Sequence, residues 1–270
     1  MKLASCAILY NPDIKELEIN IREYIDNVEI LILWLNSTLS DEQKKHLLID
    51  SKIVFMGDGT NVGISYALNA IFNWCISNSY THILTMDQDS RWINFDGFLN
   101  YVKMNGGYIQ YGPQINKCNS VICGKKVDFL ITSGSIFNIS KVLKIGGFRK
   151  DFFVDGIDID FGYKAKINNE QIIMVSGVCL EQQFGTRKSL NISTYSPNRL
   201  LEIVKTHWII FRDYFPFSFQ MIIDLVREYY IKMPIKIILF RNDRIKCFSA
   251  LFKELWRVLN GKNRNSIIKL

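Results

Sequence analysis

The feature that most constrains the fold of this chain is the alternation of strand-like and helix-like segments along its first 185 residues. Short apolar, β-branched runs predict strands, and longer segments with apolar residues every three or four positions predict helices. The predicted strands cover residues 3–10, 29–35, 51–56, 81–86 and 127–131, and the predicted helices cover residues 14–25, 40–49 and 62–77. Ser40, three residues ahead of Gln43, predicts a cap at the start of the second helix. This β-α-β-α-β order is typical of an α/β domain whose mostly parallel sheet is covered by helices on both faces.

The composition suits one large globular domain, or one domain with an appendage. The 270 residues are 48% hydrophobic and 22% charged, which allows a substantial core. The six cysteines show neither the paired spacing of a zinc site nor a secreted disulfide framework, so we expect a reducing, cytoplasmic location. The sequence has no uncharged run of about 18 residues, the length that a transmembrane helix needs.

Two carboxylates directly follow one of the predicted strands. Asp87 and Asp89, separated by Gln88, come after the apolar run of residues 80–86. Ligands of open α/β sheets bind at the carboxyl ends of the strands, so both side chains lie where a ligand crevice is expected. Carboxylate oxygens suit Mg²⁺ or Mn²⁺, and such an ion can neutralise a diphosphate. Surface turns are also rich in Asp, so this short motif alone does not decide the function.

Four further segments carry small, polar or acidic residues at predicted turns and helix starts. They are residues 10–12, 61–69, 132–135 and 152–161. The last contains Asp155, Asp158 and Asp160 in an apolar frame, and burial beside other acids raises the pKa of a carboxyl group. If this segment is helical, Asp155 and Asp158 share a face and Asp160 points elsewhere.

The order of these segments resembles family 2 glycosyltransferases of the GT-A fold, and most of all the rhamnosyltransferase-like branch that builds bacterial surface polysaccharides. The resemblance covers residues 3–212 and rests on residues 61–69, 87–90, 146–148 and 155–160. It implies a Rossmann-like catalytic domain at residues 1–195 and a helical extension at residues 196–270. It also implies an inverting hexosyltransferase that moves a sugar from a nucleoside-diphosphate donor, such as dTDP-rhamnose or a UDP-hexose. The implied acceptor is a glycan or a polyprenyl-diphosphate-linked saccharide.

The resemblance also assigns roles to residues of this chain. The Asp-x-Asp run of such enzymes holds the divalent metal, Mn²⁺ or Mg²⁺, and the donor diphosphate, which points to Asp87 and Asp89. The general base that takes a proton from the acceptor hydroxyl corresponds to Asp158, with Asp160 two residues on. The remaining positions expected to contact the donor are Asn11, Asn36, Asn61, Gly63, Ser133 and Gly134.

Three positions depart from the family pattern. Leu35 replaces the acid of an Asp-Asn pair that lies near the nucleobase in relatives, which leaves Asn36 alone. Gln182 stands where relatives often carry a His that binds metal or phosphate; Gln can donate to a phosphate but is a poor metal ligand, and Glu181 is the alternative. Lys164 replaces an Arg, which exchanges a bidentate fork for a point charge.

Positive charge is concentrated in the C-terminal quarter. Residues 199–270 hold 14 Lys and Arg against 6 Asp and Glu. Aromatic and basic helices, predicted at residues 197–214, 217–232 and 243–259 and separated by Pro216 and Pro234, suit the inner face of a membrane that carries anionic lipid. A packed helical appendage and a homodimer interface are the alternatives. We do not expect nucleic-acid binding, because no recognition motif accompanies the charge.

Two other functions compete with glycosyl transfer. A sugar nucleotidyltransferase would need a Gly-rich, basic loop after the first strand, and residues 9–12 contain none. A degenerate, non-catalytic module that binds a glycan or a partner is favoured by Leu35 and Gln182. The presence of Asp87, Asp89 and Asp158 argues against this second alternative.

Overall fold

The computed structural model describes residues 1–116, 121–182, 186–188, 192–194, 197–214, 231–240 and 243–259, together with positions 223 and 227. The chain forms two compact units, residues 1–183 and residues 184–270. The division into a catalytic domain at residues 1–195 and an extension at residues 196–270 stays a prediction.

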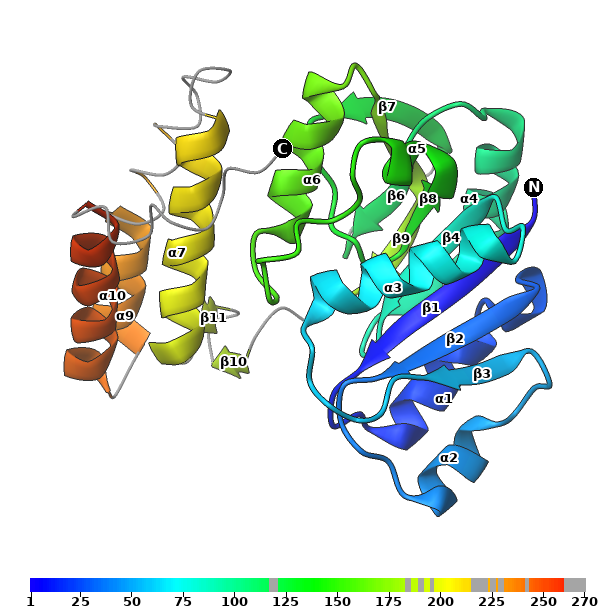
Figure 1. Ribbon diagram of the computed structural model, residues 1–270, viewed down its shortest axis with the longest axis horizontal. Helices are drawn as coiled ribbons and strands as arrows, with labels where there is room; N and C mark the ends of the chain where they lie inside the picture. Colours follow the sequence, from blue (N-terminus) through cyan, green and yellow to red (C-terminus); the bar gives the residue numbers. More distant parts are fainter. Residues whose placement is uncertain are drawn as a thin grey trace. The chain divides into compact units, whose positions relative to one another are not determined.

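The first unit is a nine-stranded sheet with helices on both faces (Figure 1). Its strands are β1 (Leu3–Leu9), β2 (Ile30–Leu35), β3 (Ile53–Met56), β4 (His82–Asp87), β5 (Arg91–Ile93), β6 (Gln110–Ile115), β7 (Cys123–Val127), β8 (Ser135–Asn138) and β9 (Ile172–Glu181). Its helices are α1 (Ile14–Arg22), a short 3₁₀ turn (Ile25–Asn27), α2 (Asp41–Leu47), α3 (Ile64–Ser77), α4 (Phe95–Met104), α5 (Ile139–Lys144) and α6 (Ile157–Ile167). The predicted α/β fold class is confirmed.

The strand order places the expected site at one edge of the sheet. The strands lie in the order β3-β2-β1-β4-β8-β6-β9-β5, with β7 paired to β9. The first four run parallel, β8 is antiparallel to both β4 and β6, and β9 is parallel to β6. The carboxyl ends of β1, β2, β4 and β9 therefore meet the amino end of β8 at the same edge. The sheet is parallel on its β3 side and mixed beyond β4.

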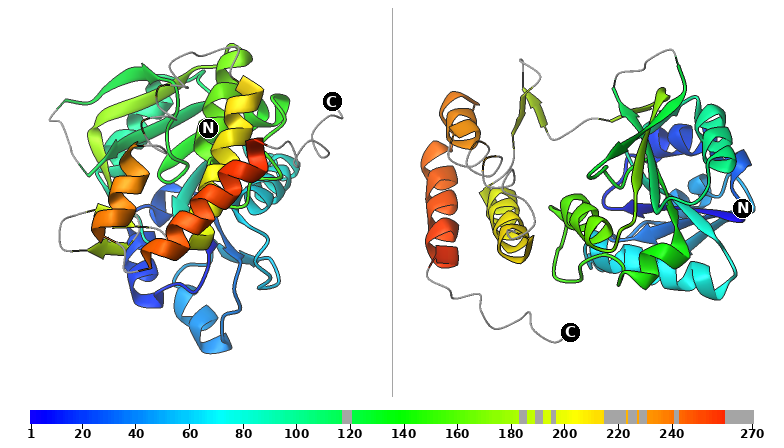
Figure 2. Two further views of the ribbon diagram at one scale, coloured as in Figure 1. Left: turned by 90° about the vertical axis from the view of Figure 1, so that its left-hand side faces the viewer. Right: turned by 90° about the horizontal axis from the view of Figure 1, so that it is seen from above.

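The helices form two layers, which Figure 2 shows from above: α1 and α4 lie on one face of the sheet, and α3, α5 and α6 on the other. The first layer packs through a large apolar core that includes Leu17 of α1 and Phe98 of α4. On the other face, four buried rings have neighbouring centroids 5.1 to 5.8 Å apart. The rings belong to Phe72, Phe137, Phe148 and Phe161. This cluster fixes α6 and the loop before it against α3 and β8.

Two local expectations have different outcomes. The cap predicted for the second helix is present: Ser40 and Gln43 form a reciprocal capping box at the start of α2. The strand predicted at residues 127–131 is wrong, because β7 ends at Val127. The chain beyond it crosses over α6 so closely that a Cβ on Gly162 would lie 2.5 Å from the carbonyl oxygen of Asp128. Residues 128–134 therefore leave the sheet.

The second unit is mainly helical in its described residues. Its elements are an antiparallel strand pair, β10 (Thr186–Lys188) and β11 (Ile192–Thr194), and the helices α7 (Pro197–Tyr214), α9 (Met233–Phe240) and α10 (Arg244–Leu259). Its core consists of Ile203, Val204, Ile237, Cys247 and Leu251. Pro234, which was predicted to separate helices, lies in the first turn of α9, where its missing N–H costs little; the helix α9 itself was not predicted. The helix predicted at residues 217–232 falls almost entirely outside the described residues.

The helices and the cysteines bear on where the protein could be located. None of the helices in the described ranges is long and apolar enough to cross a membrane. Cys179 is disulfide-bonded, whereas Cys6, Cys75, Cys123 and Cys247 are free. The cysteine spacing did not predict that bond, and the cytoplasmic location stays a prediction.

Candidate active site

A hydrogen-bonded chain of small residues holds the turn that carries the Asp-x-Asp motif. Asp87 ends β4, and its backbone N–H donates to Ser133 Oγ over 3.0 Å. The Ser133 hydroxyl in turn donates to Ser90 Oγ over 2.9 Å. Both serines are buried. The turn at residues 87–90 is thereby fixed to the turn at residues 132–134.

The middle residue of the motif ties the same turn to the end of β1. Gln88 Oε1 accepts from the Tyr10 N–H at 2.8 Å, and Gln88 Nε2 donates to the Tyr10 carbonyl at 3.1 Å. Asn11, with a positive φ of 47°, donates its backbone N–H to Ser37 Oγ at 2.7 Å. These contacts bring the ends of three parallel strands together, and they place Asn11 at that edge.

The turn at Ser133-Gly134 depends on glycine. Gly134 has a φ of 71°, and its N–H donates to the Thr85 carbonyl at 2.8 Å. A Cβ at this position would lie 2.9 Å from Leu180 Cδ2, so a side chain does not fit without movement. The residue before the two, Thr132, donates its N–H to Asp158 Oδ1 at 2.9 Å. One short turn therefore contacts both the Asp87 turn and Asp158.

Asp158 lies in the first turn of α6, which begins after Gly156 in a left-handed conformation. Burial and, to a smaller extent, the negative charge of Asp87 raise the pKa of the Asp158 carboxyl, hydrogen bonds from Thr132 lower it, and the net result is a pKa of about 7. The charge of Asp155 has a smaller effect in the same direction. The expectation that Asp155 and Asp158 share a helix face is wrong, because α6 begins at Ile157. Asp158 and Asp87 nevertheless form an electrostatically coupled pair.

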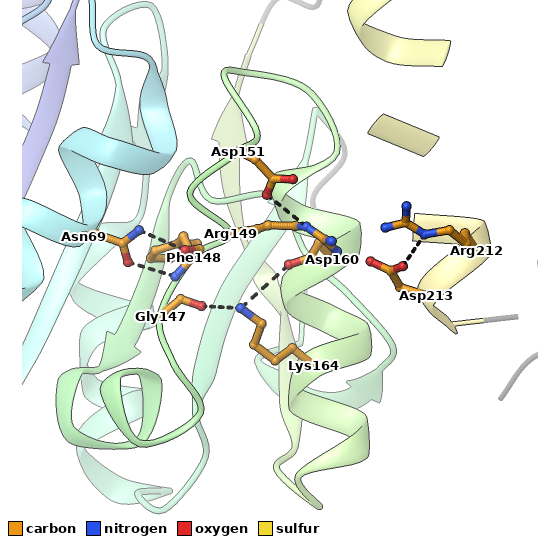
Figure 3. A network of polar contacts seen from close by, with 9 residues as sticks. All are labelled: Asn69, Gly147, Phe148, Arg149, Asp151, Asp160, Lys164, Arg212 and Asp213. Atoms are coloured by element: carbon orange, nitrogen blue, oxygen red, sulfur yellow. Dashed lines mark hydrogen bonds and ion pairs between the residues drawn. The ribbon is translucent and has the colours of Figure 1, made fainter. Parts of the chain in front are cut away.

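Asp160, in the same helix, lies in a network of ion pairs with Arg149 and Lys164 (Figure 3). It is 1% exposed, and its Oδ1 lies 3.0 Å from Arg149 Nη1. Lys164 Nζ lies 3.8 Å from Asp160 Oδ2 and donates to the Gly147 carbonyl at 2.8 Å. The sequence placed Asp160 with the catalytic acids; in the structure its carboxylate anchors the loop at residues 147–151.

A second contact fixes the other end of that loop to α3. Asn69 Nδ2 donates to the Phe148 carbonyl at 2.8 Å, and Asn69 Oδ1 accepts from the Phe148 N–H at 2.9 Å, as Figure 3 shows. Gly147 has a φ of 64°, and a Cβ there would collide with Asn69 Oδ1. The loop that leads to Asp158 is therefore held from both sides.

Gln182, one residue beyond β9, reaches the Asp-x-Asp motif. Its Nε2 donates to Asp87 Oδ2 at 2.5 Å. Asn116 clamps its backbone: Asn116 Oδ1 accepts from the Gln182 N–H at 3.0 Å, and Asn116 Nδ2 donates to the Gln182 carbonyl at 2.9 Å. Gln182 is 8% exposed, and its Oε1 has no hydrogen-bond partner among the described residues. Residues 183–185, which follow Gln182, lie outside the described part.

The three other donor-side candidates shape a loop at the end of β2. Buried Asn36 accepts from the Val62 N–H at 3.3 Å and donates to the Gly63 carbonyl at 3.4 Å. Exposed Asn61 accepts from the Gly63 N–H at 3.1 Å. A Cβ on Gly63, whose φ is 79°, would lie 2.7 Å from Phe153. Asn36 and Gly63 thus hold the loop in place, and no contact joins this group to the two aspartates among the hydrogen bonds of the described residues.

Several residues of the site were not predicted. Gln88 and Ser90 belong to the tetrapeptide that the sequence singled out, so their position was the available signal. Thr132 precedes the Ser-Gly turn by one residue. Asn116 and Arg149 gave no signal, because Asn116 contacts a residue 66 positions away and Arg149 one 11 positions away.

The chemistry of the donor atoms fits a divalent cation that is shared with a substrate. Asp89 lies on an exposed turn two residues beyond β4, and desolvation by the surrounding protein raises its pKa. Asp87 and Asp89 supply carboxylate oxygens, which are the hard ligands that Mg²⁺ and Mn²⁺ prefer. No group of three or more His, Cys, Asp or Glu side chains forms a complete metal cage within the described ranges. Such an ion would hence take further ligands from phosphates and water, as Mg²⁺ commonly does.

Solved glycosyltransferases share this fold. A structure of GalNAc-T7 with UDP, GalNAc and Mn²⁺ aligns with a TM-score of 0.61 at 10% identity over 96% of this chain. PcManGT, a mannosyltransferase from Pyrobaculum calidifontis in complex with GDP-Man and Mn²⁺, aligns with a TM-score of 0.60 at 11% identity over 98% of the chain and 76% of its own. S. aureus TarS 1-349 in complex with UDP-GlcNAc aligns with a TM-score of 0.54 at 11% identity, over 96% and 82% respectively.

These likenesses show that the chain has a GT-A fold. The chain spans 57% of the length of the GalNAc-T7 structure. No protein-family model matches the chain, and no curated protein matches it in sequence.

Proposed function

We propose that this chain is a metal-dependent, inverting glycosyltransferase that moves a sugar from a nucleoside-diphosphate donor to an acceptor hydroxyl. The observation that carries the proposal is the coupled pair of acids: Asp87 ends a central strand, and Asp158 opens α6 with a pKa raised to about 7. Perturbed acids at the carboxyl end of a sheet are typical of catalytic sites. The fold shared with transferases that were solved with UDP, GDP-Man and UDP-GlcNAc supports the same reaction class.

In this reaction Asp158 is the general base. A carboxylate with a pKa near the working pH is an effective acceptor for the proton of a sugar hydroxyl. The deprotonated oxygen then attacks the anomeric carbon, and the bond from that carbon to the diphosphate breaks on the opposite face, so the configuration inverts. The hydrogen bond from Thr132 fixes the orientation of the Asp158 carboxylate.

Asp87 and Asp89 bind the donor side. Their carboxylates would hold a divalent cation, whose positive charge would stabilise the departing nucleoside diphosphate. Gln182, whose Nε2 contacts Asp87, orients that carboxylate. At the same edge, the donor is proposed to contact Asn11 and the Ser133-Gly134 turn. The loop that contacts the nucleotide part of the donor is proposed to be shaped by Asn36, Asn61 and Gly63. Asp160 is proposed to position Asp158 through the loop that it anchors.

Within this reaction class we propose dTDP-rhamnose or a UDP-hexose as donor, and a glycan or polyprenyl-diphosphate-linked saccharide as acceptor. The support is the resemblance of residues 87–90 and 155–160 to the rhamnosyltransferase-like branch of family 2, whose products are surface polysaccharides. The corresponding location is the cytoplasm, at the inner face of the membrane.

The proposal is tested by donor turnover with the purified chain. A panel of dTDP- and UDP-sugars is incubated with Mn²⁺, Mg²⁺ or EDTA, and release of the nucleoside diphosphate is measured. We expect metal-dependent release from one donor class and, for Asp158→Asn, a loss of about 100-fold or more with donor binding retained. Asp128→Asn is the matched control, since this exposed acid pairs only with a surface lysine in the contacts of the described residues. Equal turnover in Asp158→Asn and the control would contradict the assigned base.

One observation favours a second function. The amide of Gln182 occupies Asp87 Oδ2, where a catalytic site would place a cation or its ligand. A degenerate, non-catalytic module that binds a glycan or a partner on the same fold would show this feature. It predicts saturable binding of a glycan without release of nucleoside diphosphate from any donor.

A further inference from the structure

The second unit exposes large apolar side chains along one helix. In α10, Ile245, Phe252 and Trp256 are 87%, 63% and 71% exposed. Positions separated by seven and eleven residues fall on one face of an α-helix, because these intervals are close to two and three full turns. The three side chains therefore form a single apolar stripe about 17 Å long. We refer to Ile245, Phe252 and Trp256 as the α10 stripe.

The α10 stripe is separate from the core of the unit. Cys247 and Leu251 are buried on the other side of α10 and pack with Val204 of α7. The helix, drawn next to α9 and α7 in Figure 1, thus has one apolar face inside the unit and a second one outside it. The neighbouring α9 repeats the pattern, with Ile238 and Leu239 exposed and Ile237 buried. Large apolar side chains that are exposed on one face of a helix favour an interaction site there.

The charges next to the stripe identify the occupant. Lys246 and Lys253 are exposed and, seven residues apart, lie along the same border of the stripe. Arg244 is exposed on the opposite border. The adjacent acid, Asp243, is directed to the buried side, where its Oδ1 lies 3.5 Å from Cys247 Sγ. The stripe is therefore apolar in the middle and positively charged at its borders.

We propose that the α10 stripe docks on a lipid bilayer that contains anionic lipid. Ile245, Phe252 and Trp256 would enter the boundary between headgroups and acyl chains, as the apolar face of an interfacial helix does. Lys246 and Lys253 would extend along this face and place their ammonium groups against lipid phosphates. A symmetric contact between two copies is disfavoured, because it would bring the basic borders of both stripes together. The docking surface is independent of the proposed transfer reaction.

The test is co-sedimentation of the full chain with phosphatidylcholine vesicles, with and without phosphatidylglycerol. We expect binding to the anionic vesicles that weakens with added salt, and little binding to the neutral ones. Lys246→Glu with Lys253→Glu is expected to weaken binding at least about tenfold, since each basic residue near the surface contributes roughly 1 kcal/mol. Lys15→Glu with Lys103→Glu makes the same change in net charge at exposed positions of the first unit and is expected to leave binding unchanged.

The apolar part of the stripe has its own variants. Phe252→Ser with Trp256→Ser is expected to lower vesicle binding at least about tenfold, while Ile19→Ser, at a 55% exposed position of α1, leaves it unchanged. Circular dichroism determines whether each variant is folded. If the apolar variants do not fold, the lysine variants decide the test. Absence of binding to anionic vesicles, or equal binding by the stripe and control variants, would overturn the proposal. So would a wild-type dimer that becomes a monomer in Phe252→Ser with Trp256→Ser, because the occupant would then be a second copy.

Discussion

At the scale of single residues, the pKa of the Asp158 carboxyl is set by effects of opposite sign. Burial and the charge of Asp87 raise its pKa, hydrogen bonds from Thr132 lower it, and the balance is a pKa of about 7. An unperturbed Asp titrates near pH 4. The surroundings of Asp158 therefore raise its pKa into the pH range in which a carboxylate is useful as a general base.

The same shift makes the stability of the metal-free protein depend on pH. Because the folded state binds this proton more tightly than the unfolded state, the stabilisation from Asp158 is complete below about pH 4 and is lost as the pH rises through about 7. Asp158→Asn removes this dependence. We expect the Tm of the variant in EDTA to exceed that of the wild type at pH 8 and to approach it at pH 4. A constant difference in Tm across this range would contradict a desolvated Asp158 that is coupled to Asp87.

The contact of Gln182 with Asp87 leads to a second prediction for single residues, which concerns metal affinity. Its amide orients Asp87, and hydrogen-bond partners of metal-binding carboxylates influence metal affinity about 10- to 100-fold. We expect Gln182→Leu to weaken Mn²⁺ binding by that factor in an electron paramagnetic resonance titration. Gln171→Leu changes an exposed glutamine just before β9 and is expected to retain the wild-type Kd. The same Kd in both variants would show that Gln182 does not act on the metal site.

At the scale of elements, the loop between α5 and α6 determines where Asp158 lies. Arg149 and Lys164 connect this loop to Asp160, Asn69 connects it to α3, and Phe148 packs in the aromatic cluster. Because these contacts surround the loop, its position is set by three separate elements. A change at Arg149 is thus expected to affect both the stability of the protein and the site.

The third prediction concerns the buried ion pair in this network. Arg149→Met leaves the carboxylate of Asp160, 1% exposed, without its 3.0 Å partner, which costs roughly 3 kcal/mol of unfolding free energy. Adding Asp160→Leu should restore most of that loss. Urea unfolding measures both variants, with Arg22→Met as control, since Arg22 pairs with Glu18 on an exposed surface and contributes less than about 1 kcal/mol. A loss at Arg149 no larger than at Arg22 would contradict the network.

The elements show how far local patterns determine the structure. The periodicity of residues 62–77 and the capping box at Ser40 were sufficient to predict α3 and the start of α2, because both depend on neighbours in sequence. The apolar residues 127–131 suggested a strand, yet α6 draws them out of the sheet. Pro234 suggested a helix boundary and lies in the first turn of α9, but the sequence did not predict that helix. These failures occur where contacts distant in sequence, or the position of a residue within a turn, decide the outcome.

The candidate site divides in the same way. The position of Asp87, Asp89 and Asp158 at one edge followed from the order of strands and helices. The pairing of Asp160 with Arg149 and the clamp of Asn116 on Gln182 did not, since they depend on the register between separate elements. Asp160 therefore looked like a second catalytic acid in the sequence, although it anchors a loop in the structure.

At the scale of the whole molecule, the sheet order explains why so many candidates converge. Parallel β1, β2 and β4 end at the same edge, and antiparallel β8 begins there. Residues from positions 11, 87, 133 and 182 are thus assembled by topology. The second unit, with a core of its own in α7, α9 and α10, carries the proposed membrane contact. Chemistry and docking are accordingly assigned to different units.

Calorimetric titration with dTDP- and UDP-sugars measures whether the edge that carries Asp87 and Asp89 binds a nucleoside-diphosphate donor through a divalent cation. Titrations of the wild type and of Asp89→Asn, each with Mn²⁺ and with EDTA, separate the contribution of the metal from that of the protein. We expect the wild type to bind one donor class in Mn²⁺, and its affinity to fall at least about tenfold in EDTA and in Asp89→Asn. Equal affinity under all four conditions, or no binding of any donor with either Mn²⁺ or Mg²⁺, would contradict donor binding through a divalent cation.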